Sequence, residues 1–164
     1  MSEAILALGS NLGDRIENLR TALDLLGERG ATVTRVSSVW ETPPVPADQP
    51  RYLNAAVAVE TALSPEEVLA AAKEVERLLG RRPTGHWRPR PIDIDVLFCG
   101  EQQVATETLT VPHPRIAERA FVLLPLSEVT ERPLPVLGRS AAELLAGLDT
   151  SGHERLGLRL RGGS

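Results

Sequence analysis

The sequence is poor in the features that mark secreted, membrane-spanning and nucleic-acid-binding proteins. It contains a single cysteine, Cys99, so it cannot form an internal disulfide. It has no recognisable secretory signal and no apolar run long enough to span a bilayer. Its net charge of −4 argues against general binding to nucleic acid or to a membrane surface. We therefore expect a cytoplasmic protein with no nucleic-acid or membrane partner, in which Cys99 is a small buried residue.

The chain has the length and composition of one folded domain. Its 164 residues are 42% hydrophobic, which is enough to build a core. It has no internal repeat, and no linker divides it. We predict one domain over residues 1–164, with the residues after about 149 forming a tail that frays at its end.

Positive charge is concentrated in one short region. Lys73 is the only lysine, and five of the arginines fall within fourteen residues. These are Arg77, Arg81, Arg82, Arg88 and Arg90. A local cationic cluster on an acidic protein favours a small anionic ligand, although a solvated basic loop explains the same pattern.

An Asp-x-Asp pair follows the basic region directly. Residues 92–99 first alternate between apolar and acidic side chains and then are all apolar, which predicts a strand with Asp93 and Asp95 on one face. Their Cα atoms would lie roughly 6.5–7 Å apart. Two carboxylates this close repel each other unless a cation lies between them, and hard oxygen ligands suit Mg²⁺ held together with substrate phosphates. The alternative is the solvated face of an edge strand.

The order of predicted elements indicates the fold class. We expect helices over residues 14–28 and from Ser64 to Gly80, and a short helix from Ser140 to about 148, the last two opening with capping boxes. We expect strands over residues 4–8, 33–40, 52–60 and 92–99, and a shorter one near 108–111. This order predicts an α+β fold with a ferredoxin-like βαββαβ core, a mixed or antiparallel sheet with helices packed on it, and extra C-terminal elements. The loops 41–51 and 80–91 should then lie over the sheet end that carries Asp93 and Asp95.

Two residues of the third strand suggest a site for a flat ligand. Tyr52 and Asn54 are two apart and share a face, so a ring and an amide could stack on and hydrogen-bond a heterocycle. The alternative is that Tyr52 packs in the core and Asn54 satisfies a turn.

Several motifs in a fixed order resemble the 6-hydroxymethyl-7,8-dihydropterin pyrophosphokinases, over almost the whole chain. They are Leu8-Gly9-Ser10-Asn11-Leu12-Gly13-Asp14, Thr42-Pro43-Pro44, Asp48-Gln49-Pro50 before Tyr52-Leu53-Asn54-Ala55, Trp87-Arg88-Pro89-Arg90 before Ile92-Asp93-Ile94-Asp95, and Val111-Pro112-His113-Pro114-Arg115 before Arg119 and Phe121. The resemblance implies a ferredoxin-like monomer that moves a pyrophosphoryl group from ATP to the pterin hydroxymethyl group and releases AMP.

The resemblance also implies a role for each matching residue. Asp93 and Asp95 match ligands of two Mg²⁺ ions, and together with Arg90 and Arg82 they form the implied catalytic set. The implied ATP-binding residues are Glu76, Trp87, Arg90, Thr110, His113 and Arg119. The implied pterin-binding residues are Thr42, Pro43, Pro44, Val45, Tyr52, Asn54 and Phe121. Arg81, Arg82 and Arg88 remain alternatives for one phosphate contact.

Two other classes of protein fit part of the pattern. A nucleotidyl- or glycosyl-transferase uses an Asp-x-Asp metal site too, but leaves Tyr52, Asn54 and Phe121 unexplained. A ferredoxin-like binding or regulatory module leaves the carboxylate pair without a task. Binding of ATP that depends on Mg²⁺ distinguishes an enzyme from such a module.

Overall fold

The structure is a computed structural model that describes residues 1–44, 48–80 and 90–161. Its elements in chain order are β1 (Ser2–Ser10), α1 (Arg15–Glu28), β2 (Ala31–Val36), β3 (Ser38–Thr42), β4 (Tyr52–Thr61), α2 (Pro65–Leu78), β5 (Asp93–Cys99), β6 (Val104–Ala105), β7 (Thr110–Val111), a 3₁₀ turn (Ile116–Glu118), α3 (Ala120–Val129), α4 (Ala141–Leu145) and β8 (Glu154–Arg159). Among these described residues, no helix is both long and apolar enough to cross a membrane.

One antiparallel sheet organises the molecule. Its strands lie in the order β5-β1-β4-β3-β8, and β2 also pairs with β4. Every described pair of strands in it is antiparallel. Of the two predicted possibilities, a mixed or an antiparallel sheet, the described strands form the antiparallel one. Strand β5, which carries Asp93 and Asp95, lies at one edge of the sheet.

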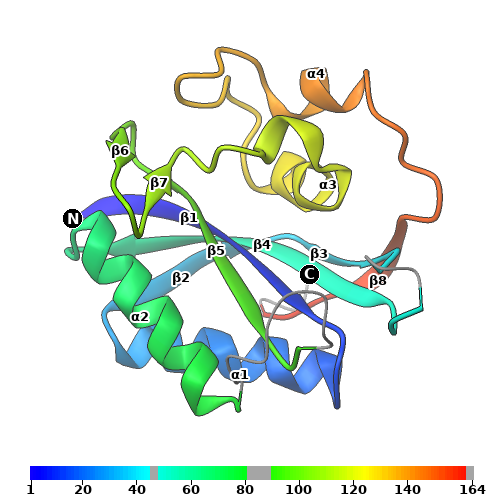
Figure 1. Ribbon diagram of the computed structural model, residues 1–164, viewed down its shortest axis with the longest axis horizontal. Helices are drawn as coiled ribbons and strands as arrows, with labels where there is room; N and C mark the ends of the chain where they lie inside the picture. The colour runs from blue at the N-terminus through cyan, green and yellow to red at the C-terminus, as the bar shows by residue number, and fades with distance from the viewer. Residues whose placement is uncertain (45–47, 81–89, 162–164) are drawn as a thin grey trace.

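Helices cover both faces of the sheet (Figure 1). On one face, α1 and α2 pack on the core that contains Leu6, Leu8, Val57 and Ile94. On the other, α3 and α4 pack on a second core that contains Ala58 and Phe98. Because side chains alternate along a strand, the residues between those of the first core, including Asp93 and Asp95, face α3.

Local sequence signals explain where the helices begin. Asp14 caps α1 by accepting a hydrogen bond from the backbone N–H of Glu17 at 3.1 Å, and capping boxes open α2 and α4 as predicted. Cys99 is buried as expected, and its burial raises the pKa of its thiol to about 11.

Two predictions of the local structure are wrong. The expected strand 33–40 is two strands, because the five residues from Val36 to Trp40 face only four, from Val57 to Asn54. The side chain of Ser37 fills the interruption by accepting a hydrogen bond from the backbone N–H of Ala56 at 2.9 Å.

The prediction that the residues after about 149 form a tail is also wrong for most of that segment. β8 pairs with the edge of β3, Leu160 is buried, and the guanidinium of Arg159 donates to the carbonyl of Val36 at 2.6 Å. Pairing of this kind joins residues more than a hundred positions apart, so no local pattern announces it.

Candidate active site

A cavity of about 400 Å³ lies between the sheet and α3. Most of the predicted site residues line it, together with residues that were not predicted. Its wall consists of Ala7, Leu8, Gly9, Thr42, Pro43, Tyr52, Asn54, Arg90, Asp93, Asp95, Arg115, Arg119, Phe121 and Val122. These residues come from β1, β3, β4, β5 and α3 and from the segments that precede β5 and α3, so the fold gathers them from the whole chain.

One side of the cavity is aromatic and carries an amide. Tyr52 and Asn54 come from β4 and Phe121 from the first turn of α3. Asn54 is 9% exposed, and its Nδ2 donates to the hydroxyl of Thr42 at 2.5 Å. That bond fixes the orientation of the amide. This side of the cavity suits a flat heterocycle with hydrogen-bonding edges.

Gly9 makes this arrangement possible. A Cβ atom at Gly9 would lie 2.8 Å from Oδ1 of Asn54 and 3.3 Å from Cδ1 of Tyr52. No side chain fits there without displacing both residues. No local pattern in the sequence indicates that Tyr52 and Asn54 approach Gly9.

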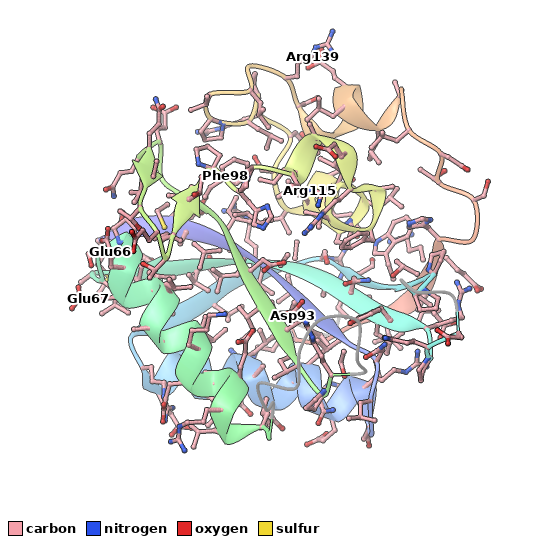
Figure 2. The ribbon with its side chains drawn as sticks, viewed as in Figure 1. Glu66, Glu67, Asp93, Phe98, Arg115 and Arg139 are labelled. Carbon is pink, nitrogen blue, oxygen red and sulfur yellow. The ribbon has the colours of Figure 1, made fainter. Side chains whose placement is uncertain are left out.

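The other side of the cavity is charged. Asp93 and Asp95 both face it, and Nη1 of Arg90 lies 3.5 Å from Oδ1 of Asp93. Arg115 and Arg119 reach it from the segment before α3. In Figure 2, Asp93 lies on β5 and Arg115 beside α3. Arg115 was part of a recognised motif, but it was not among the predicted site residues.

The carboxylate pair has the electrostatic character of a cation site. Burial, together with the negative charge of Asp93, raises the pKa of Asp95 to about 6, and the positive charge of Arg119 acts in the opposite direction. A cation bound between these two carboxylates would offset the repulsion between their negative charges. Among the described residues, no three or more acidic, histidine or cysteine side chains are grouped so that they could hold a metal ion by themselves. An ion held here would therefore take its other oxygen ligands from a substrate or from water.

Asn11 joins three loops behind the charged side. Asn11 is 1% exposed, its Oδ1 accepts from the backbone N–H of Arg90 at 2.7 Å, and its own N–H donates to the carbonyl of Arg90 at 3.0 Å. Its Nδ2 donates to the carbonyl of Pro50 at 3.1 Å and to Oε1 of Gln49 at 3.3 Å. The described ends of loops 41–51 and 80–91 thus meet at this residue, at the end of the sheet where they were expected.

Four of the predicted residues lie off the described wall of the cavity. Glu76 is buried on α2 and accepts from the backbone N–H of Ile94 at 2.8 Å. Thr110 is exposed in β7, and Pro44 is half-buried beside Pro43. The fourth, His113, is half-buried. Burial, with the positive charges of Arg119 and Arg115, lowers the pKa of His113, while Asp93 opposes the shift. Their roles at the nucleotide or the pterin stay predictions.

Three of the predicted residues, Arg82, Trp87 and Val45, lie outside the described residues. So do Arg81 and Arg88. The choice among the arginines of that loop therefore stays open.

Fold and site together define an α+β protein with a cavity that joins an aromatic, amide-bearing side to a side of paired carboxylates and arginines. A profile of the family described as 7,8-dihydro-6-hydroxymethylpterin-pyrophosphokinase (HPPK) matches residues 5–131. A 2-amino-4-hydroxy-6-hydroxymethyldihydropteridine pyrophosphokinase of Methylorubrum extorquens is 44% identical over 158 residues, which cover 95% of this chain and 99% of the relative. The chain belongs to the HPPK family.

Other relatives are longer proteins. The "Folate synthesis bifunctional protein, mitochondrial" of Pisum sativum is 48% identical over 128 residues, which cover 77% of this chain and 25% of that protein. The chain spans about a quarter of the length of this relative and of two similar Arabidopsis thaliana proteins. The crystal structure of Plasmodium falciparum HPPK-DHPS with pteroate aligns with a TM-score of 0.74 and 15% identity, over 88% of this chain and 44% of that one. At this low identity, the structural match shows a shared fold and no more.

Proposed function

We propose that this protein transfers the pyrophosphoryl group of ATP to the hydroxymethyl group of 6-hydroxymethyl-7,8-dihydropterin, a step of folate biosynthesis. The pterin hydroxyl oxygen bonds to the β-phosphorus and loses its proton. The bond from that phosphorus to the bridging oxygen on the α-phosphorus breaks, and AMP leaves with that oxygen. The products are AMP, the pterin pyrophosphate and a proton.

The observation that carries the proposal is the two-sided cavity in a chain of this family. A pterin placed between Tyr52 and Phe121 presents its polar edge to Asn54. Its hydroxymethyl group then points toward Asp93, Asp95 and the arginines, where the phosphates of ATP would lie. A cavity of about 400 Å³ is of the size that small ligands occupy.

Positioning and charge neutralisation are the main demands of this reaction. Arg90, Arg115 and Arg119 supply positive charge at the cavity wall, and guanidinium groups match phosphate oxygens with paired donors. The side chain of Arg119 also lies over the Phe121 ring, with Cζ 5.7 Å from the centroid. Arg119 thus contacts both sides of the cavity and is placed to orient one substrate against the other.

Mg²⁺ fits the carboxylate pair. The donors are two hard oxygen ligands on one strand face, and burial together with the charge of Asp93 raises the pKa of Asp95, so a bound cation would favour its ionised form. When bound, Mg²⁺ would neutralise phosphate charge and polarise phosphate oxygens. Asp93 and Asp95 would hold two ions together with ATP. We infer that the proton of the pterin hydroxyl is lost to Asp95, or directly from the hydroxyl when a metal ion holds it as an alkoxide.

The proposal also covers the type of fold, the cellular compartment and the oligomeric state. Taken in chain order, β1, α1, β2, β4, α2 and β5 have the βαββαβ sequence, and the sheet order β5-β1-β4-β2 supports the ferredoxin-like label. We place the activity in the cytoplasm, in keeping with the buried free thiol of Cys99. We expect a monomer, for which light scattering would give the mass of one 17.7 kDa chain, whereas twice that mass would overturn the expectation.

A product assay tests the central step. The protein is incubated with Mg²⁺, ATP and 6-hydroxymethyl-7,8-dihydropterin, and the nucleotides are resolved by chromatography. AMP formed in a one-to-one ratio with pterin consumed is the expected result, and it should disappear when EDTA removes the metal. ADP would indicate transfer of a single phosphoryl group, and absence of pterin-dependent turnover would favour a binding module. Either outcome would overturn the proposal.

A further inference from the structure

The C-terminal segment 149–161 lies beyond the residues that the family profile matches, yet it approaches Pro43, one of the residues that line the cavity. β8 pairs with β3, with Glu154 opposite Glu41 and Arg155 opposite Trp40. In Figure 1, β8 lies at the edge of the sheet formed by β3, away from β5. Glu41 is followed by Thr42 and Pro43, which line the cavity. The segment thus contacts the strand that leads into the cavity wall.

Gly152 is the point of closest approach. A Cβ atom at Gly152 would lie 3.1 Å from Cγ of Pro43, and the backbone of Gly152 has φ +75°. Pro43 therefore lies against the backbone of Gly152, and Pro43, unlike Gly152, is among the residues that line the cavity. A side chain at position 152 would press on Pro43, which would have to move by a few tenths of an ångström.

Charged contacts bind the same turn to β3 and β4. Nη2 of Arg51 donates to the carbonyl of Gly152, and Nε of Arg51 lies 3.5 Å from Oε1 of Glu41. Nη1 of Arg15 lies 2.9 Å from Oε2 of Glu41 and donates to the carbonyl of Arg51 at 3.0 Å. Arg51 precedes Tyr52, the aromatic residue of the cavity. Gly152 is thus linked to both strands that supply the pterin side.

The far end of the segment is fixed as well. Glu128 of α3 accepts hydrogen bonds from the hydroxyl of Ser38 at 2.7 Å and from Nε1 of Trp40 at 2.7 Å. Nε of Arg155 donates to the same Ser38 hydroxyl at 3.0 Å. A segment held to the sheet along its length can transmit a fixed position to Pro43, which a frayed tail could not do.

We propose that Gly152, with the segment around it, is a positioning residue that sets the width of the pterin side of the cavity by fixing the position of Pro43. This inference rests on the proposed function, because it assumes that the ligand beside Pro43 is the pterin. A simpler interpretation is that β8 only covers the open edge of β3. The two interpretations differ in whether a change at position 152 alters pterin recognition or only stability.

The experiment compares Gly152→Ala with Gly138→Ala. Gly138 also has a positive φ, +69°, but a Cβ atom there would have nothing within 4 Å. Both variants carry a similar backbone strain, and only the first presses on Pro43. We expect Gly152→Ala to raise the KM for pterin about fivefold or more, because small displacements of substrate-positioning groups have large kinetic effects. We expect the KM for ATP to stay within about twofold, and Gly138→Ala to leave both unchanged.

A second variant, Gly152→Asn, separates the effect of backbone strain at position 152 from the effect of the contact with Pro43. Asn tolerates positive φ better than Ala does, yet it brings the same Cβ atom. Gly152→Asn should therefore recover melting temperature relative to Gly152→Ala and keep the raised pterin KM. An unchanged pterin KM in both variants, with an active parent protein, would overturn this inference. A parent protein that makes no pterin-dependent AMP would instead overturn the proposed function.

Discussion

The carboxylate of Glu76 accepts a hydrogen bond from the backbone N–H of Ile94 at 2.8 Å. Ile94 lies between Asp93 and Asp95 on an edge strand, so this N–H points away from β1 and has α2 as its neighbour. Glu76 is 3% exposed, and Nζ of Lys73 lies 3.6 Å from its Oε1. Helix α2 thus supports the strand segment that presents the carboxylate pair, from the face opposite the cavity.

The first prediction concerns this support. Glu76→Ala leaves the Ile94 N–H without its acceptor and should lower the free energy of unfolding by about 1–3 kcal/mol. Glu76→Gln keeps an oxygen acceptor and should lose less. Urea unfolding at neutral pH measures both. The control is Glu74→Ala, on the same helix, where an exposed carboxylate pairs only with exposed Arg77 in the described contacts and the change should stay within about 0.5 kcal/mol. Equal losses for Ala and Gln at position 76 would contradict this role.

The second prediction concerns pH and Asp95. Its pKa is about 6 in the folded protein, against an ordinary value of 3.8. Between these values the folded state binds more protons than the unfolded state, so stability falls as pH rises through this window. Asp95→Asn cannot ionise and should therefore be more stable than the parent at pH 7.5, by on the order of 1–2 kcal/mol without metal. The difference should vanish near pH 4.

Although Asp95→Asn should raise stability at pH 7.5, it should lower turnover. Asp95→Asn removes a ligand charge and should lower kcat about a hundredfold or more while changing pterin affinity little. Asp24→Asn, an exposed carboxylate of α1 paired with Arg161, should change neither. Near-normal turnover of Asp95→Asn would rule out a metal site built on this pair, and a variant less stable than the parent at pH 7.5 would contradict the electrostatic argument.

The sequence located the parts of the site that follow a local period. Asp93 and Asp95, like Tyr52 and Asn54, are two apart on a strand, so each pair had to share a face. Capping boxes likewise marked the starts of α2 and α4. Arg90, Arg119 and Phe121 depended on family resemblance, because no period relates them to the strands they face.

What the sequence could not provide was long-range geometry. Arg115 is brought to the cavity by the path of the chain between β7 and α3, and Asn11 meets Arg90 across 79 positions. The pairing of β8 with β3 is accompanied by hydrogen bonds from Arg155 to Ser38 and from Arg159 to Glu128, which join distant parts of the sequence. The interruption at Ser37 is invisible to an alternation pattern, because a bulge shifts the register without changing composition.

The third prediction concerns Gly9. Gly9→Ala places a Cβ atom 2.8 Å from Oδ1 of Asn54, which must move away from the cavity wall or rotate. We expect the KM for pterin to rise about tenfold while the KM for ATP changes little, since the displaced residues lie on the pterin side. Steady-state kinetics with each substrate varied in turn measure this. The matched control is Gly27→Ala in α1, where nothing lies within 4 Å and the helix should gain about 0.5–1 kcal/mol. A pterin KM unchanged by Gly9→Ala would show that Asn54 and Tyr52 do not recognise this ligand.

The last prediction concerns Asn11, which bonds to the loop on each side of the cavity. Asn11→Ala removes the acceptor of the Arg90 N–H and the donor to the Pro50 carbonyl, and a buried polar group without a partner costs about 1–3 kcal/mol. Because Arg90 and the residues around Pro50 then lose their common anchor, we expect kcat/KM to fall for both substrates, unlike the one-sided effect of Gly9→Ala. Asn18→Ala is the control, since its amide donates to Leu12 at 2.9 Å but contacts neither loop. If Asn11→Ala lost stability with full activity, Asn11 would be a structural residue only, and the two sides of the cavity would be positioned independently.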